Sequence, residues 1–209
     1  MDDMNLHDSA EVISILKERL EPAERADSLA DVIEAQYPHA RKAAVLLGLF
    51  DHAGETHLAF VRRAATLRSH SGEIAFPGGA VEPGDDTVVM TALREAREEI
   101  GLELRPADLR LTGLIAEHGY QGQSHWLMFL FEVKPRLKSL PPAHREGRFK
   151  FFRRDALASL KMPQTDLEQL WPLFWQHRGG FFAAHCHCHP DGRNEWTVEE
   201  SIKLRVPNF

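Results

Sequence analysis

Two stretches decide how this chain is interpreted: Phe76-Pro77-Gly78-Gly79 and, further along, Arg94-Glu95-Ala96-Arg97-Glu98-Glu99-Ile100-Gly101-Leu102. The first places two glycines in a turn just ahead of a helix, and the second crowds that helix with carboxylates. Glu95, Glu98 and Glu99 are spaced i, i+3 and i+4, which puts all three on one side of a helix. Such like charges repel unless a cation lies among them, and Mg²⁺ prefers oxygen ligands of this kind. The pattern predicts metal-dependent hydrolysis of a phosphate ester; the alternative is a solvated acidic helix face.

The other residues of these stretches have expected local roles. An arginine cannot ligate a metal, so we expect Arg94 to orient a neighbouring glutamate through a bidentate pair. Gly78 and Gly79 lack a Cβ, which lets the backbone approach a pyrophosphate closely. The helix is expected to run to Ile100, with Gly101 at its C-terminal cap and with Asp85, Asp86 or Thr87 as its N-terminal cap.

Residues 94–102 resemble the second half of the Nudix box, Arg-Glu-apolar-x-Glu-Glu-x-Gly-apolar, at every position. The first half departs from the commonest box, which has five residues between its glycine and a Glu and then seven before the Arg. Counting five residues from Gly79 leads to Asp85, whereas counting seven back from Arg94 leads to Asp86. The loop is therefore one residue longer, and an Asp replaces the Glu.

Residues 68–79 read Arg-Ser-His-Ser-Gly-Glu-Ile-Ala-Phe-Pro-Gly-Gly. They are similar to Arg-x-x-x-Gly-x-x-x-Phe-Pro-Gly-Gly, the signature of the coenzyme A pyrophosphatase branch of the Nudix family. The resemblance implies that a nucleoside diphosphate linked to another moiety is split, with coenzyme A or a derivative as the first expectation. ADP-ribose, a dinucleotide or a damaged nucleotide is the alternative substrate. A Nudix domain without catalysis, acting as a ligand sensor, is the alternative of a different class.

The resemblance also implies which residues act. Mg²⁺, with Mn²⁺ as a substitute, would be held by the metal ligands Glu95, Glu98 and Glu99. The catalytic residues would be Glu95, Glu98, Arg94 and, from a loop ahead of a strand, Glu146. Substrate binding would fall to Gly78, Gly79, Arg68 and the neighbouring Arg62 and Arg63, for which a solvated strand end is the alternative.

The fold expected is α+β, a Nudix-type α/β/α sandwich with a mixed central sheet. We expect helices at 9–20 and 28–36, strands at 42–50, 56–63, 74–76, 109–117, 125–133 and 149–152, and closing helices at 154–160 and 166–177. Residues 1–40 are expected to form an N-terminal helical extension, 41–160 the hydrolase domain, and 161–209 a C-terminal helix and β-hairpin packed on it.

Composition limits the partners. A chain of 209 residues with 43% apolar residues can bury a full core. The net charge of -6 argues against general affinity for nucleic-acid backbones or anionic lipid, so we expect a small-molecule partner. The N-terminus does not have the pattern of a secretory signal, and the apolar run 43–50 is too short to cross a bilayer, so we expect a cytoplasmic protein. The family resemblance suggests a homodimer.

The segment 181–199 is expected to form a hairpin around a turn at 190–192. Alternation puts His185, His187 and His189 on one face and Cys186 and Cys188 on the other, and one intervening residue disfavours a disulfide between the cysteines. The histidines form a candidate Zn²⁺ site, completed by Glu195 or Glu199; simple exposure is the alternative. A third interpretation is a substrate wall or dimer surface built with Trp171, Phe174, Trp175 and Trp196.

Overall fold

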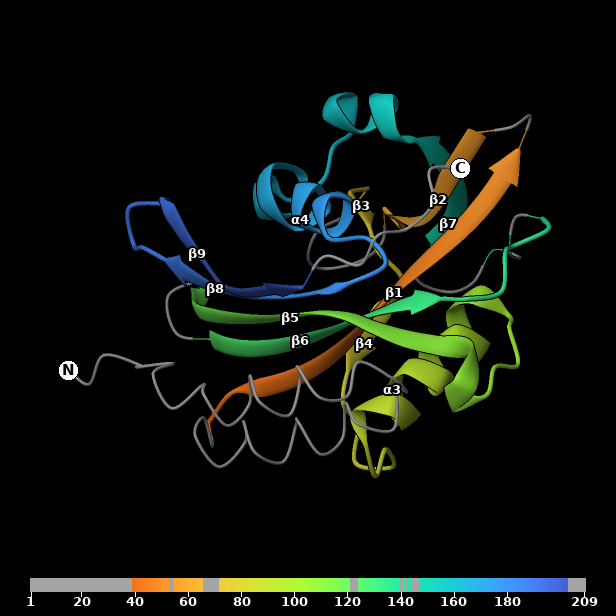
Figure 1. The fold of residues 1–209 in the computed structure, drawn as a ribbon, viewed down its shortest axis with the longest axis horizontal. Helices are drawn as coiled ribbons and strands as arrows, with labels where there is room; N and C mark the ends of the chain where they lie inside the picture. Colours follow the sequence, from red (N-terminus) through yellow and green to blue (C-terminus); the bar gives the residue numbers. More distant parts are fainter. Residues whose placement is uncertain are drawn as a thin grey trace.

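The computed structural model describes residues 39–52, 55–65, 72–120, 124–139, 141, 143 and 147–202 (Figure 1). The helices expected at 9–36 lie outside these residues. The described elements are β1 Arg41–His52, β2 Glu55–Arg63, β3 Ile74–Ala75, β4 Gly78–Ala80, α3 Val88–Glu95, the π-helix Ala96–Ile100, the 3₁₀ helix Pro106–Asp108, β5 Leu109–Tyr120, β6 Ser124–Val133, β7 Gly147–Arg153, the 3₁₀ helix Arg154–Ser159, the π-helix Asp166–Leu170, α4 Trp171–Gln176, β8 Phe181–Cys188 and β9 Asn194–Ile202.

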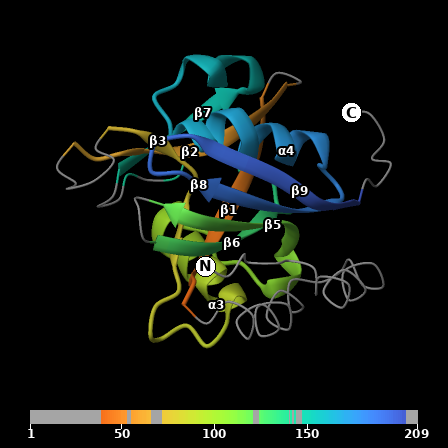
Figure 2. The ribbon, with the colours of Figure 1, turned by 90° about the vertical axis from the view of Figure 1, so that its left-hand side faces the viewer.

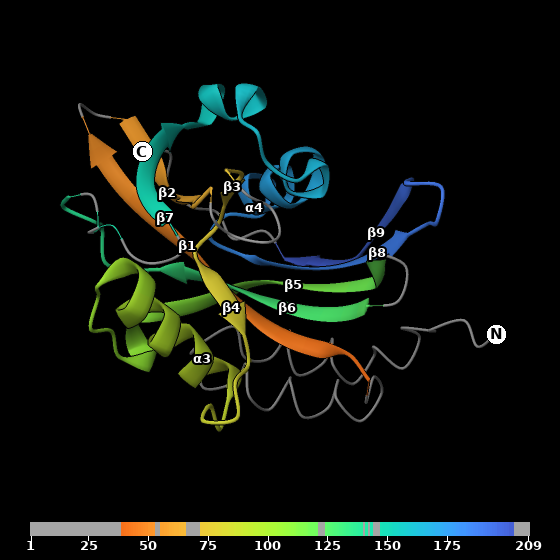
Figure 3. The same cartoon turned by 180° about the vertical axis from the view of Figure 1, so that it is seen from behind.

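The strands join into a mixed sheet, as expected. Its main path runs β3-β2-β1-β6-β5-β8-β9, with β4 paired to β1 and β7 paired to β2. Two neighbouring pairs, β1 with β6 and β5 with β8, are parallel, and the other pairs are antiparallel. Long β1 crosses from the β5–β6 part of the sheet to the β2–β7 part (Figures 1 and 3).

β1 and β2 form a hairpin, but the two strands pair only between Leu49–His52 and Glu55–Leu58. The earlier part of β1 pairs instead with β6 on one side and with β4 on the other. From Ala43 to Gly48, β1 is apolar and mostly buried, which is typical of a strand covered on both faces.

Alternating side chains divide the core between the two faces of the sheet. On one face, α3 packs through Val88, Val89 and Ala92 against residues that include Phe129 and Phe131. On the other face, α4 packs against residues that include Leu130 and Ile115. Figure 2 shows α3 and α4 on opposite sides of the strands. These apolar contacts attach α3 to the sheet. We call α3 and the π-helix Ala96–Ile100 that follows it the box helix.

The hairpin of β8 and β9 is confirmed and extends the same sheet beyond β5. Its turn is closed by Gly192 N–H donating to the His189 carbonyl at 3.0 Å. Trp171 and Phe174 are buried in the α4 core rather than forming a surface, which corrects that interpretation of these two aromatics. The division of the chain into segments 1–40, 41–160 and 161–209 stays a prediction.

The closing helices differ from the regular helices expected. Residues 154–159 form a 3₁₀ helix, and 166–170 form a π-turn that runs into α4. Pro172 lies at the start of α4 and has no N–H to donate, so the regular hydrogen-bond ladder is interrupted at this point. None of the helices in the described part of the chain combines the length and apolar character needed to cross a membrane.

Candidate active site

The box helix begins at the residue where its capping chemistry begins. Thr87 is the N-cap, and its side chain accepts a hydrogen bond from the Met90 N–H at 3.1 Å. At the other end, Gly101 has φ 72 and closes the helix, with the Leu102 N–H donating to the Ala96 carbonyl at 3.0 Å. Both predicted ends are confirmed.

The last turn of this helix is wider than expected. Residues Ala96–Ile100 form a π-turn, in which the Gly101 N–H reaches back to the Ala96 carbonyl. No residue preference in the sequence signals such a turn. Single π-turns are rare and occur frequently at functional sites, and this one contains two of the three glutamates.

The three glutamates do not share one environment. Glu95 and Glu99 are buried, at 8% and 7% exposure, whereas the Glu98 side chain is 46% exposed. The Glu95 Oε1 accepts a hydrogen bond from Arg94 Nη1 at 2.7 Å, and the Glu99 Oε2 accepts one from the Gly78 N–H at 2.8 Å. The expected common face is therefore divided into two inward carboxylates and one outward carboxylate.

Arg94 makes its bidentate contact with Asp85, not with a glutamate. Its Nε and Nη2 donate to the Asp85 carboxylate at 2.9–3.2 Å, and only Nη1 turns to Glu95. Asp85 also accepts hydrogen bonds from the Thr91 hydroxyl and from the Glu82 N–H, each at 3.0 Å. The sequence left Asp85 and Asp86 open for the acidic position, and the contacts select Asp85.

This clamp keeps Asp85 charged. Burial alone would raise the pKa of Asp85, but the hydrogen bonds from Arg94, the Glu82 N–H and Thr91 together lower it. The hydrogen bond to Asp85 likewise raises the pKa of Arg94. The cost of burying the charged pair is offset by this full set of hydrogen bonds.

Gly78 and Gly79 are required by close packing in the protein itself. Gly78 has φ 141, and a Cβ there would overlap the Ala44 carbonyl oxygen of β1. A Cβ on Gly79 would overlap the Glu95 carboxylate. Strand β4 is thereby held between β1 and the carboxylate helix, and the approach of a pyrophosphate to these glycines stays a prediction.

An open cavity of about 280 Å³ borders the other side of β4. Residues from five parts of the chain meet there, and they include Phe76, Glu117, Tyr120, Trp126, Asp166 and Leu170. Burial, together with the negative charges of Glu117 and Asp166, raises the pKa of Tyr120. Glu95, Glu98 and Glu99 do not line this cavity, so β4 lies between the cavity and the carboxylates.

The sequence analysis did not identify Glu117 and Tyr120, which line the cavity, as candidate site residues. Glu117 is a charged residue near the end of an apolar strand, and that is the signal that could have marked it. Burial raises the pKa of Glu117. Its Oε1 lies 3.8 Å from the Cys188 Sγ.

Of the predicted arginines, the two in the described part of the chain do not line this cavity. Arg62 is exposed and Arg63 half-buried at the end of β2, opposite Arg148 and Gly147 of β7, and neither lines the cavity. Arg68 and Glu146 lie outside the described residues. The substrate-binding and catalytic roles of all four stay predictions.

The carboxylates of Glu95, Glu98 and Glu99 do not meet at one point. Among the described residues, the group whose three ligand atoms all lie within 4.8 Å of one another is Glu117, Cys186 and Cys188. A cation on the box helix would therefore take one or two of its carboxylates and complete its shell with water and substrate oxygens, which is how Mg²⁺ is usually held.

A family model described as the NUDIX domain matches residues 39–174. The chain belongs to the Nudix family. The Uncharacterized Nudix hydrolase NudL of Photorhabdus laumondii is 52% identical over 82 residues, and that of Pectobacterium atrosepticum is 43% identical over 75 residues. These matches cover 38% and 36% of this Nudix chain, and 43% and 38% of the relatives. The chain thus spans less than half the length of these curated relatives.

Solved structures share the Nudix fold. The MutT protein of Bacillus halodurans superposes with a TM-score of 0.58 and 20% identity over 76% of this chain and 97% of that one. The NUDIX domain of Shewanella oneidensis NrtR was solved in complex with ADP ribose. It superposes with a TM-score of 0.54 and 13% identity over 66% of this chain and 87% of that one. At these identities the likeness shows the fold alone.

Proposed function

We propose that this Nudix protein is a divalent-metal-dependent hydrolase that splits the diphosphate of a nucleoside diphosphate linked to another moiety. One observation carries the proposal: Gly78 N–H donates to Glu99 while Glu95 lies against Gly79. The glycine strand that lines the cavity is thus bonded to the carboxylate helix. A diphosphate lying along β4 would have the cavity on one side and the carboxylates on the other.

The donor set of the box helix fits a divalent cation, as Nudix enzymes generally use. Glu95, Glu98 and Glu99 offer oxygen donors, and a carboxylate accepts at two oxygens, so one hydrogen bond does not exclude a cation at the other. Mg²⁺ is the first candidate and Mn²⁺ the second, since both prefer oxygen ligands. When bound, the cation neutralises charge on the diphosphate and lowers the pKa of water.

The residues of the box helix orient the carboxylates and accept the proton of the attacking water. Asp85 holds Arg94, and Arg94 holds the Glu95 carboxylate, so the orientation of Glu95 is set before substrate arrives. Glu98 is the glutamate of the three that faces solvent. Besides offering an oxygen to the cation, Glu98 is the residue to which we assign the acceptance of a proton from the attacking water, with Glu146 as the other candidate.

The cavity supports a substrate with one compact, partly apolar group beyond the diphosphate. Its walls include the rings of Phe76 and Trp126, and its volume, about 280 Å³, is at the small end of ligand pockets. Coenzyme A or a derivative is our first choice because residues 68–79 match that branch signature. ADP-ribose is the second, since the NrtR domain was solved with it. A homodimer and a cytoplasmic location stay predictions.

The test is product release from coenzyme A, ADP-ribose, NADH, a diadenosine polyphosphate and deoxynucleoside triphosphates, each with Mg²⁺ and with chelator. We expect metal-dependent splitting of coenzyme A into adenosine 3',5'-bisphosphate and phosphopantetheine. Preference for another compound would keep the hydrolase and refute the substrate. Tight binding of one compound without turnover would refute hydrolysis and favour a sensor.

A further inference from the structure

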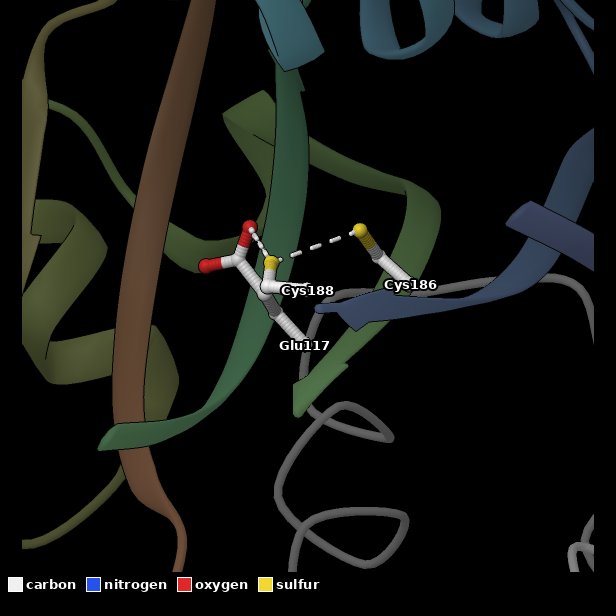
Figure 4. Close-up of side chains that lie close together, drawn as sticks. All are labelled: Glu117, Cys186 and Cys188. Atoms are coloured by element: carbon white, nitrogen blue, oxygen red, sulfur yellow. Dashed lines mark hydrogen bonds between the residues drawn. The ribbon is translucent and has the colours of Figure 1, made fainter. Parts of the chain in front are cut away.

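The C-terminal hairpin brings two thiols and a carboxylate together on the α4 face of the sheet. Cys186 and Cys188 lie on β8, next to β5, where Glu117 is in register with Cys186. The Sγ atoms of the two cysteines are 3.8 Å apart, and the Glu117 Oε1 lies 3.8 Å from the Cys188 Sγ (Figure 4). The three side chains point toward one another from two neighbouring strands.

This spacing fits a tetrahedral thiophilic cation. Two sulfur atoms, each about 2.3 Å from Zn²⁺, are about 3.8 Å apart in such a site. A carboxylate is an accepted third ligand for zinc, and a carboxylate oxygen of Glu117 lies within 4.8 Å of both sulfur atoms. Mg²⁺ prefers oxygen ligands alone, so this site and the box helix select different metals.

The carboxylate of Glu117 has no ion pair with a cation among the described residues, although it is only 7% exposed. Burying a carboxylate without a cation is costly, and this burial raises the pKa of Glu117. Burial also raises the pKa of the Cys186 and Cys188 thiols. A bound cation would offset the charge of all three groups at once, with release of the thiol protons.

A disulfide does not explain the pair as well. Residues i and i+2 of a strand have Cα atoms about 6.6 Å apart, near the upper limit for a disulfide. Their Cβ atoms would have to approach to about 3.8 Å, which an extended strand does not allow. The two thiols can, however, meet a common atom placed between them.

The histidines of the same strand lie on its other face. The rings of His187 and His189 stack with centroids 4.4 Å apart, and His187 also packs against His118. His189 Nε2 lies 3.3 Å from the Glu195 Oε2. Among the described residues these groups do not converge on one point as the cysteines and Glu117 do, so a zinc site on the histidine face stays an expectation.

We propose that Glu117, Cys186 and Cys188 form a second metal site, which takes Zn²⁺ or another thiophilic divalent cation. Three protein ligands leave one tetrahedral position for water or a ligand group. Cys188 is half-buried, and Glu117 also lines the open cavity, so the cation has a route to the site. Bound there, it joins β5 to β8 and fastens the C-terminal hairpin to the sheet.

The test uses Co²⁺ as the probe, added to the full-length, reduced protein in the presence of excess Mg²⁺. We expect one Co²⁺ per chain, with a sulfur-to-cobalt charge-transfer band in the near ultraviolet and visible bands typical of a tetrahedral ion. Zn²⁺ should displace the Co²⁺ and raise the unfolding temperature. Glu117→Gln should weaken Co²⁺ binding by at least about 10-fold, since loss of even an outer-shell partner costs that much.

Cys188→Ser is the main variant because Cys188 is half-buried, and it should remove most of the charge-transfer band. Cys186→Ala, at a fully buried position, is the second variant and should also remove most of the band. His187→Asn is the matched control: it lies between the two cysteines on the opposite face and should leave the band unchanged. The proposal would be overturned if the wild-type protein showed no charge-transfer band or if the band survived Cys188→Ser. It would also be overturned if His187→Asn removed the band while the cysteine variants kept it. So would a protein whose mass shows Cys186 and Cys188 already oxidised to a disulfide and which binds no Co²⁺ after reduction.

Discussion

Glu95 on α3 and Glu117 on β5 are buried to nearly the same extent, 8% and 7% exposed, yet their surroundings differ in kind. Glu95 lies beside Arg94, which is itself fixed by Asp85. Glu117 has the Cys188 thiol beside it and no ion-paired cation among the described residues. The comparison teaches that burial alone does not define a functional carboxylate, because the neighbouring charge decides whether it is already stabilised as an anion or needs a cation.

The first carboxylate cluster is Glu95, Glu98 and Glu99 on the box helix. The largest loss of turnover is expected from Glu98→Gln. Glu98 is exposed, so the fold should be kept, but removal of one ligand charge should lower Mg²⁺-dependent turnover by at least about 100-fold. Glu103→Gln is the control, because Glu103 is exposed just beyond the same helix. Steady-state kinetics with the preferred substrate of the panel measure both. Equal turnover in the two variants would refute the role of Glu98.

Gly79→Ala should come next. Its new Cβ would push the Glu95 carboxylate away from β4, and a misplaced catalytic group costs about 10- to 100-fold in rate. Gly84→Ala provides the comparison, since a Cβ on Gly84 meets nothing within 4 Å. Kinetics and thermal unfolding of both variants separate a displaced carboxylate from a damaged fold. A Gly79→Ala protein with wild-type rates would show that the position of Glu95 is unimportant.

Asp85→Asn should have a smaller effect on rate and a clear effect on stability. It weakens the charge-assisted bonds to Arg94, so we expect about 10-fold slower turnover and about 1–3 kcal/mol lower free energy of unfolding. The neighbouring Asp86→Asn, at an exposed position, should change neither. Chemical denaturation supplies the free energies. If Asp86→Asn were the harmful change, the acidic position of the box would have been misassigned.

The smallest effect concerns the histidines on the face opposite Glu117. Burial, and then the charges of His125, His187 and His185, lower the pKa of His118. Its unfolded pKa, about 6.5, is thus above its folded pKa, so stability is full above pH 6.5 and falls as the pH drops from there toward the folded pKa.

His118→Asn should flatten this loss of stability between about pH 7.5 and pH 5.5. His39→Asn, at an exposed position outside this group of histidines, is the control and should preserve it. Free energies of unfolding at the two pH values test the point. An unchanged slope in His118→Asn would contradict the linkage.

The sequence predicted the first cluster because its parts are close along the chain. The two ends of the helix, with Thr87 as its N-cap and Gly101 at its C-terminal cap, follow from residues within 78–102. The spacing also placed the three glutamates on one helix, but it did not show that two of them are buried and one is exposed. The π-turn at 96–100 was not predicted, since no residue preference in the sequence signals it. The choice of Asp85 over Asp86 also needed the contact with Arg94, which counting residues could not supply.

The second cluster, Glu117 with Cys186 and Cys188, could not be predicted in the same way. Alternation along β8 correctly separated the cysteines from the histidines, because period two is a property of the strand alone. The carboxylate partner is 71 residues away from Cys188 in sequence, and only the pairing of β5 with β8 brings it near. The sheet order was likewise beyond local patterns. Most strands were predicted, but β4 was not, because its two glycines were expected in a turn.

The most direct test of the central claim, that the box helix holds the divalent cation, is Mn²⁺ binding followed by electron paramagnetic resonance. All three proteins in the titration would carry Cys188→Ser, so that the thiols do not compete for Mn²⁺. One has the wild-type box helix, one adds Glu98→Gln and one adds Glu103→Gln. We predict Mn²⁺ binding to the wild-type box helix, at least about 10-fold weaker binding in Glu98→Gln and no change in Glu103→Gln. Equal binding in all three proteins would place the cation elsewhere and contradict the account.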